Sequence, residues 1–249
     1  MQEETIHKIN NSSNFTLSLS KGNNSINHQF IKSKLTYKTI KYEVIDQIGY
    51  LTLNTPPSNP MTSLFFEEMH DFVDSLNTEQ LNALIIQGEG RHFSSGADLD
   101  DLLAKIGEEG SVDNFFLKNS ESFDFFNQLN IPVIAIIRGV CIGSAFELAL
   151  SCHFRFCTEN SVLGLPESTF NLMPGCGGSL KLTSQVDKAK ALDLLLTGRS
   201  ISPDEALEFN LIDKILPKND ISDFSVKFAK SIAEGYRKEL KKYYINKHC

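Results

Sequence analysis

Two glutamates lie in stretches of the sequence that are otherwise apolar, an unusual place for a carboxyl group. Glu147 stands among the apolar residues of Ala145–Leu150, and Glu167 follows an apolar run that ends at Pro166. Burying an unpaired carboxylate is costly, so such a group takes up a proton, finds hydrogen-bond donors or lines a cavity. A structural carboxylate, bonded to the backbone or to an arginine, is the alternative for Glu147. Two such carboxyls together indicate general acid–base chemistry.

Two segments rich in small residues could hold the oxygen on which negative charge develops. Gly88–Leu99 and Gly139–Leu150 each follow an apolar run typical of a buried strand, and each leads into a predicted helix. Small residues let the backbone approach a ligand closely, and free N–H groups at a helix start suit an anionic oxygen. Alone, Gly88–Leu99 is better explained as a tight turn between a strand and a helix. With the two glutamates, these segments predict proton transfer beside an oxyanion held by the main chain.

Several other kinds of site are not indicated by the motifs. The glycines of a third unusual segment, Leu163–Gly178, do not form the dinucleotide pattern G-x-G-x-x-G, because position 180 is leucine. No serine stands in a G-x-S-x-G nucleophile motif. The five cysteines are odd in number and lack C-x-x-C spacing, and the six histidines form no H-E-x-x-H motif. We therefore expect no metal site and no disulfide framework, which fits a reducing cytoplasm.

Length and composition favour one globular domain that can enclose a pocket. The chain has 249 residues, of which 41% are hydrophobic and 22% charged, and its formal net charge is −7. An acidic protein lacks the basic face that neutralises phosphates, so we expect no nucleic-acid partner. No apolar run approaches the roughly 20 residues that cross a bilayer, and the polar start of the chain does not resemble a secretory signal. These features predict a cytoplasmic protein without membrane association.

The segments that carry chemistry are set between alternating strands and helices. Residues 1–37 are rich in Asn, Ser and Lys without an apolar period, and we expect a mobile tail there. Tyr42–Ile45 and Tyr50–Leu53 are predicted to form a hairpin with its turn at 46–49. An amphipathic helix should begin at Ser63. Such alternation indicates an α/β fold with mostly parallel strands.

The same periodicity predicts the later elements. Continuous apolar runs predict strands that are buried on both faces, and apolar residues three or four apart predict helices. The remaining predicted strands are 83–87, 132–137, 154–156, 161–165 and 211–216, and the remaining predicted helices are 98–106, 113–129, 143–150 and one long helix within 220–246.

Four motifs in order give the sequence a specific resemblance. They are R-H-F-S-S-G-A-D-L at 91–99, P-V-I-A-I-I-R-G-V-C-I-G-S-A-F-E-L-A-L at 132–150, L-P-E followed by P-G-C-G-G-S-L-K-L within 165–182, and L-T-G-R-S-I-S-P-D-E-A-L-E-F-N-L-I-D-K-I at 196–215. Through these motifs, residues 38–216 resemble the crotonase superfamily, also called the enoyl-CoA hydratase/isomerase family.

This resemblance implies the fold and the assembly. The implied fold is an α/β spiral of stacked β-β-α units with a helical C-terminal region that packs in trimers. In this chain the spiral core would span 38–196, and the C-terminal region, with one strand, would span 197–249 and be shorter than in many relatives. The implied assembly is a homotrimer or a hexamer.

The resemblance also implies a site for an acyl thioester of coenzyme A. In the family, two backbone N–H groups hold the thioester oxygen and stabilise an enolate, and these positions fall on Ala97 and Ser144. Family members often have glycine where Ser144 stands, so the serine side chain could narrow the pocket. No cofactor is expected beyond the coenzyme A or phosphopantetheine of the substrate itself. The other expected substrate-binding residues are Gly96, Asp98, Leu99, Gly143 and Gly175.

The presence of both glutamates resembles the family's hydratases, in which two glutamates hold the water that adds across the 2,3 double bond. Those positions fall on Glu147 and Glu167, whereas isomerases of the family commonly use only the later glutamate. We expect Glu167 to exchange a proton with the substrate carbon and Glu147 to position and activate water. The expected function is an enoyl-CoA hydratase-like hydro-lyase that adds or removes water.

Three alternatives stay open. A crotonase-type isomerase or decarboxylase could use the same oxyanion site. Asp100 and Asp101 stand where family hydratases often have a basic residue near the nucleotide phosphates, although Lys105 could compensate. With the short C-terminus, this departure favours acyl groups tethered to a carrier protein, as in polyketide-type biosynthesis. A non-catalytic acyl-thioester-binding protein is the third alternative, which the intact glutamates disfavour.

The remaining reactive side chains are assigned structural roles. The cysteines are expected to be small core or near-core residues, and the phenylalanines within 115–126 to line the core or the pocket wall. Asp98 is expected to cap or brace the helix that follows it. His92 is expected to be a loop residue. The cysteines concerned are Cys141, Cys152, Cys157 and Cys176.

Overall fold

The protein is described here by a computed structural model of residues 37–102, 104 and 112–247. The tail predicted at 1–37 lies outside the described residues except for Tyr37, and so does part of the helix predicted at 98–106. All described residues belong to one compact unit of the chain, and a boundary at residue 196 stays a prediction.

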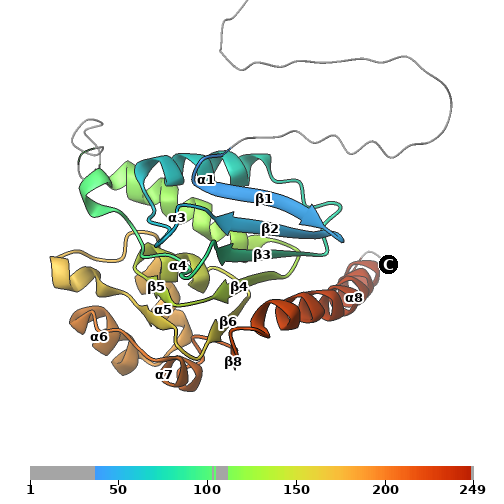
Figure 1. Ribbon diagram of the computed structural model, residues 1–249. Helices are drawn as coiled ribbons and strands as arrows, with labels where there is room; N and C mark the ends of the chain where they lie inside the picture. The colour runs from blue at the N-terminus through green and yellow to red at the C-terminus, as the bar shows by residue number, and fades with distance from the viewer. Residues whose placement is uncertain (1–36, 103, 105–111, 248–249) are drawn as a thin grey trace, which may run out of the picture. The chain divides into compact units, whose positions relative to one another are not determined.

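A six-stranded sheet in the order β1-β2-β3-β4-β6-β8 forms the larger β-layer (Figure 1). β1 (Ile40–Ile45) and β2 (Ile48–Leu53) form the predicted hairpin, and its turn is confined to Asp46 and Gln47, which both have positive φ. From β2 onward every neighbouring pair is parallel, which confirms the predicted α/β class. The remaining strands of this sheet are β3 (Ala83–Gly88), β4 (Val133–Ile137), β6 (Phe154–Thr158) and β8 (Lys214–Leu216).

A second β-layer consists of shorter pairings. β5 (Val140–Ile142) and β7 (Val162–Gly164) pair in parallel, and single bridges extend this layer from Ser94 to Cys141 and from Leu163 to Ile201. The chain leaves the large sheet after β4 for β5, returns for β6, and leaves again for β7. This repeated passage between two layers produces stacked turns of a spiral.

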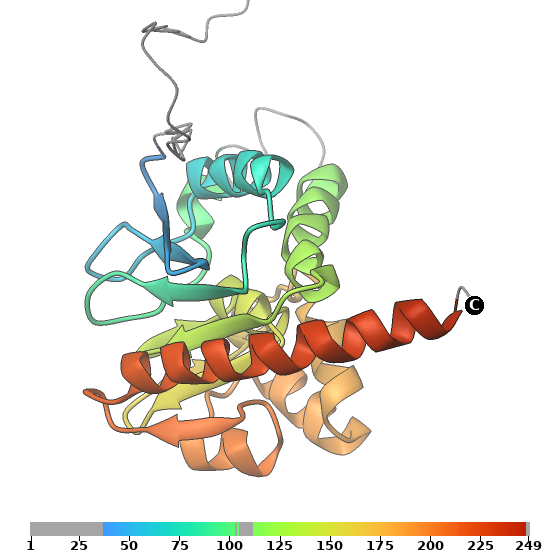
Figure 2. The ribbon, with the colours of Figure 1, turned by 90° about the vertical axis from the view of Figure 1, so that its right-hand side faces the viewer.

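Helices cover both faces of the large sheet. Figure 2 shows α8 running across one face, while α1 and α3 lie on the other side of the strands. The side chain of Thr62 caps the first helix by accepting a hydrogen bond from the N–H of Phe65. The helices are α1 (Ser63–Ser75), α3 (Val112–Gln128), α4 (Ser144–Leu150), the 3-10 helix η1 (Pro166–Phe170), α5 (Gly178–Gln185), α6 (Lys188–Thr197), α7 (Pro203–Glu208) and α8 (Ile221–Lys247).

Alternation along the buried strands divides the core in two. On β4, Val133, Ala135 and Ile137 face the cluster that includes α1, α3 and α4, whereas Ile134 and Ile136 face the cluster under α8. Successive side chains of a strand point to opposite faces, so a strand that is covered on both sides must be apolar throughout. This burial on both faces explains the continuous apolar run at Val133–Ile137 in the sequence.

The strand predicted at 211–216 is shorter than expected. Only Lys214–Leu216 pairs with β6. The N–H groups of Leu211 and Ile212 instead donate to the carbonyl oxygen of Ala206, in the turn that ends α7. Asn210 in this turn has φ 58°, which reverses the chain direction before the strand can begin.

Candidate active site

Three segments that are far apart in the sequence converge on Gly143. A Cβ added to Gly96 would lie 2.5 Å from the carbonyl oxygen of Ile142 and 3.5 Å from Cα of Gly143. A Cβ added to Gly143 would lie 3.4 Å from Oε1 of Glu167. The loop at Gly96, the start of α4 and the carboxyl of Glu167 are therefore immediate neighbours, as the motifs predict.

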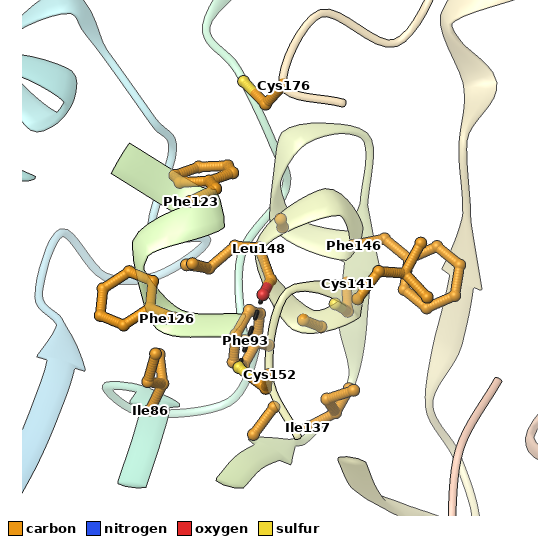
Figure 3. Packing of buried hydrophobic residues seen from close by; sticks show 14 of the residues in the cluster. Ile86, Phe93, Phe123, Phe126, Ile137, Cys141, Phe146, Leu148, Cys152 and Cys176 are labelled. Atoms are coloured by element: carbon orange, nitrogen blue, oxygen red, sulfur yellow. Dashed lines mark hydrogen bonds between the residues drawn. The ribbon is translucent and has the colours of Figure 1, made fainter. Parts of the chain in front are cut away.

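α4 places Glu147 in the interior. The helix is buried on every side, and Figure 3 shows Leu148 on the side of Phe123 and Phe126 of α3 and Phe146 on the opposite side, near Cys141. Glu147 is 0% exposed, in agreement with the apolar character of its neighbours in the sequence. A carboxyl in such a place requires hydrogen-bond partners or a functional role.

Two main-chain N–H groups hold one oxygen of Glu147. Cys176 N and Gly178 N donate to Oε1 at 2.8 and 2.7 Å, and Oε2 makes no hydrogen bond with the described residues. Burial raises the pKa of Glu147, and these two amides oppose the shift by stabilising the charged form. The Lys181 ammonium and the Ser144 hydroxyl act in the same direction as the amides.

Glu167 lies in the first turn of η1, where the residue is half-buried and its Oε2 is fully buried. Burial and the neighbouring charge of Glu147 raise the pKa of Glu167 to about 7. The two carboxyls are twenty residues apart in the sequence, but both lie near the start of α4, since Glu167 approaches Gly143 and Gly143 precedes the helix that carries Glu147. A carboxyl with a pKa near neutrality can both give and take a proton under physiological conditions.

The two predicted oxyanion donors lie on either side of the Gly96–Gly143 contact. Ser144 is the first residue of α4, and its N–H precedes the first donor of the helix, so it has no intrahelical acceptor. Ala97 pairs with Met61, but the bonds of this bridge are made by Met61 N and Asp98 N. Among the described residues, neither Ala97 N nor Ser144 N finds an acceptor. Both N–H groups are therefore free to bind an oxygen.

Gly96→Ala should disrupt this arrangement. The new Cβ would lie 2.5 Å from a main-chain oxygen, at φ 83°, so the loop must move away from α4. We expect kcat to fall about 100-fold, as when an oxyanion donor is lost, and the unfolding midpoint to fall too. Gly90→Ala is the matched control, because Gly90 has φ 75° but nothing within 4 Å. Equal activity of the two variants in a steady-state assay would contradict the proposed oxyanion loop.

The other sequence-predicted residues surround this centre. Asp98 donates its N–H to Met61 O, and its Oδ1 accepts a hydrogen bond from Asp101 N, so it caps the next helical segment as expected. Leu99 begins that segment and is half-buried. Gly175 is half-buried beside Cys176, whose N–H holds Glu147. No direct contact of Leu99 or Gly175 with the two carboxyls is seen.

The structural roles assigned to reactive side chains are confirmed where they are described. Four cysteines are buried and free, as expected of small core residues. His92 lies in a loop, where its Nδ1 accepts a hydrogen bond of 3.0 Å from Val140 N. The cysteines are Cys141, Cys152, Cys157 and Cys176.

Asn59 is a residue of the site region that the sequence reading missed. Its Nδ2 donates to the carbonyl oxygens of Glu89, His92 and Phe93, and its Oδ1 accepts from Thr55 N. These bonds join the loop before α1 to the loop that ends at Ala97. The signal available in the sequence was an asparagine in a proline-rich loop, a residue type that tolerates the positive φ of 49° found here.

Arg155 is a second missed residue, and it fixes the far end of α4. Its guanidinium is buried and donates to the carbonyl oxygens of Ala149, Cys152 and Leu211 at 3.4, 2.6 and 2.8 Å. Cations near the last carbonyls of a helix stabilise it. Arg155 therefore holds in place the short helix that carries Glu147.

The structure also bears on metal binding and on membrane insertion. Within 37–102, 104 and 112–247, no group of His, Cys, Asp and Glu side chains is arranged to hold a metal ion. In that same part of the chain, no helix is both long and apolar enough to span a membrane.

A spiral α/β fold that brings two carboxyls together beside free main-chain N–H groups defines a class of enzyme that transfers protons next to an oxyanion. Comparison with known proteins gives the family. The sequence model of the enoyl-CoA hydratase/isomerase family matches residues 43–246. The chain belongs to the enoyl-CoA hydratase/isomerase family.

Individual relatives agree with this assignment. A probable enoyl-CoA hydratase of Bacillus subtilis is 33% identical over 210 residues, which cover 82% of this chain and 81% of that protein. The alpha subunit of the fatty acid oxidation complex of Idiomarina loihiensis is 34% identical over 192 residues, which cover 74% of this chain and 27% of the subunit. The crystal structure of enoyl-CoA hydratase from Bacillus anthracis superposes with a TM-score of 0.72 at 30% identity, covering 79% of this chain and 77% of that one. These matches confirm the crotonase-type fold.

Proposed function

We propose that the protein is an enoyl-CoA hydratase, a hydro-lyase that adds water across the 2,3 double bond of an acyl thioester or removes it. The observation that carries the proposal is the meeting of the Gly96 loop, the start of α4 and the Glu167 carboxyl at Gly143. This meeting supports the proposal, because the scheme needs the N–H groups of Ala97 and Ser144 and the two carboxyls near one reacting group. The names of relatives as hydratases support the same activity.

The proposed reaction assigns each group one task. The N–H groups of Ala97 and Ser144 hold the thioester oxygen and stabilise the enolate. Glu147, ionised, accepts a proton from water while the water oxygen bonds to carbon 3. Glu167, protonated, delivers its proton to carbon 2. The proton taken up by Glu147 replaces the one lost from Glu167, so the pair again carries one proton when the product leaves.

This scheme predicts a bell-shaped pH profile with its alkaline limb near neutrality. Burial and the charge of Glu147 raise the pKa of Glu167 to about 7, and loss of the shared proton inactivates the pair. Addition of water leaves the proton count of the enzyme unchanged, so the same form is active in both directions. We expect kcat/KM to fall about tenfold per pH unit above the limb, for hydration and for dehydration alike. Rates that stay level well above neutral pH would contradict the assignment.

One assay tests the activity and the carrier. We propose acyl-CoA as the substrate, supported by the names of the relatives. Crotonyl thioesters of coenzyme A and of a phosphopantetheinylated carrier protein are compared by loss of the absorbance of the conjugated thioester. Turnover of the coenzyme A substrate alone supports the proposal. Turnover of the carrier-protein substrate alone would contradict it and show that the natural acyl group is tethered to a carrier protein. The scheme uses only side chains and amides, so dialysis against a chelator should leave the rate unchanged.

We further propose that the protein self-associates as a homotrimer or a hexamer. Large apolar side chains of η1, α5 and α6 and of the segment between η1 and α5 are exposed, which is typical of a surface that is covered in an assembly. The mass in solution, measured by light scattering during size-exclusion chromatography, tests this; a monomer would contradict it. The side chains are Phe170 (60% exposed), Met173 (60%), Leu180 (77%) and Leu196 (69%).

We propose a cytoplasmic location for the enzyme. The four buried, free cysteines suit a reducing compartment. Fractionation of cells that express the full chain tests the location, and recovery outside the cytoplasm would contradict it.

A further inference from the structure

Lys181 lies between the candidate site and helix α3, and the proposed mechanism does not use it. Its side chain is 13% exposed, and its Nζ lies 2.6 Å from Oδ1 of Asp124 on α3. The same Nζ donates a hydrogen bond of 3.0 Å to the carbonyl oxygen of Cys176. Lys181 therefore ties the turn in front of α5 to α3, through one carboxylate and one main-chain carbonyl.

This turn carries the two N–H groups that hold Glu147, those of Cys176 and Gly178. The residue between them, Gly177, has φ 84°, and a Cβ there would lie 2.7 Å from Nζ of Lys181. The lysine head thus packs against the turn at the point between its two donors. A Cβ on Gly178 would lie 2.7 Å from Cγ and Oε1 of Glu147, so the turn is also tight on its other side.

We propose that Lys181, anchored by Asp124, is a positioning residue that keeps the Cys176–Gly178 turn closed on Glu147 and so directs the free oxygen of that carboxyl toward the reacting water. The inference rests on the proposed hydratase function. Lys181 acts through the turn and through its charge, and not on the reacting atoms themselves.

The charge of Lys181 has a consequence for pH dependence. The titratable groups that face Glu147 are Lys181 on α5, Glu167 on η1 and Cys176 on the turn, and Asp124 on α3 faces Lys181. Burial raises the pKa of Glu147, and Lys181 is among the groups that hold it down. Without the ammonium, the pKa of Glu147 should rise further. The acidic limb of the pH profile, which reports protonation of this base, should then move to higher pH.

Three substitutions separate the hydrogen bond from the charge. Lys181→Met removes both, Lys181→Gln keeps an N–H donor without the charge, and Lys181→Arg keeps both. In Lys181→Met we expect kcat for crotonyl-CoA hydration to fall about 10- to 100-fold with a smaller change in KM, because small displacements of a catalytic group cost about this much. The acidic limb should move up in the Met and Gln variants and return in the Arg variant.

Lys230→Met is the matched control, because it breaks an ion pair of 3.0 Å to Asp46 in which both side chains are largely exposed. It should leave kcat and the pH profile unchanged. A folded Lys181→Met variant with the kcat and acidic limb of the wild type would overturn the inference. Should Lys181→Met fail to fold, the comparison of Lys181→Gln with Lys181→Arg decides in its place.

A second measurement does not depend on turnover. The amide resonances of Cys176 and Gly178 in NMR spectra report the ionisation of the carboxyl that they bind. Their titration midpoint should lie at higher pH in Lys181→Gln than in the wild type, and an equal midpoint would count against the inference. If the wild type does not hydrate crotonyl thioesters, the proposed function fails, while the midpoint still tests the link between Lys181 and Glu147.

Discussion

Glu167→Gln is expected to lower kcat for hydration by about 10²- to 10⁴-fold, the usual contribution of a general acid or base, while thioester binding survives. Glutamine has nearly the shape of glutamic acid but no proton to exchange with carbon 2. Oε2 of Glu167 makes no hydrogen bond with the described residues, so an amide nitrogen in its place breaks no hydrogen bond of the fold. Initial rates with crotonyl-CoA measure the loss, and calorimetric titration with the saturated butyryl thioester measures binding.

The control for this variant is Glu208→Gln on α7, where the carboxyl is exposed and distant from Gly143 in the chain. Its rate and its unfolding midpoint should match those of the wild type. A Glu167→Gln enzyme with full turnover would remove Glu167 from the mechanism. Loss of binding together with turnover would instead show that Glu167 shapes the pocket, and the proton would have to come from another group.

The arrangement of the sheet could be predicted because burial leaves a direct trace in the sequence. β4 must be apolar at every position, since its residues alternate between the core under α1 and α3 and the core under α8. β5 could not be found in this way. It has only three residues, Val140–Ile142, and they lie among the small residues that the oxyanion segment requires. A strand this short is defined by its pairing with β7, which depends on the assembled spiral.

The site shows the same division between local and tertiary causes. The apolar neighbours of Glu147 predicted its burial, because every side of a helix that is apolar all round must be covered. Its hydrogen-bond donors, Cys176 N and Gly178 N, come from about thirty residues further along the chain, and nothing local to either segment indicates the contact. Asn59 and Arg155 were missed for this reason, since both bind main-chain carbonyls of other turns of the spiral.

Two glycines of the site show why residue type can carry more information than periodicity. Gly96 and Gly143 both have positive φ, and the space that a Cβ would need is taken by Ile142 O in one case and approached by Glu167 Oε1 in the other. The family resemblance implied that both bind the substrate, and small residues permit a close approach of the backbone. The structure gives a more direct reason: the segments that carry these glycines contact each other and Glu167, which leaves little room for larger side chains.

Glu147→Gln is expected to abolish hydration nearly as fully as Glu167→Gln, by about 10²- to 10⁴-fold. The amide oxygen of glutamine can still accept from Cys176 N and Gly178 N, so the turn stays in place while the base is lost. Glu147→Ala is less informative. It leaves both buried N–H groups without an acceptor, which costs about 1–3 kcal/mol of stability for each, and it would confuse a loss of chemistry with a loss of structure.

The same Glu147→Gln enzyme separates a hydratase from an isomerase. Moving a double bond from carbon 3 to carbon 2 needs one group that takes a proton from carbon 2 and returns it to carbon 4, and Glu167 alone, with its pKa of about 7, can do this. Hydration needs a second group, because water must be deprotonated while carbon 2 is protonated. Rates for crotonyl-CoA and for a 3-enoyl-CoA are therefore measured on one preparation. If hydration is lost and any isomerisation persists, the second carboxyl is what makes this chain a hydratase; if hydration persists, water is activated elsewhere and Glu147 is only a structural carboxylate.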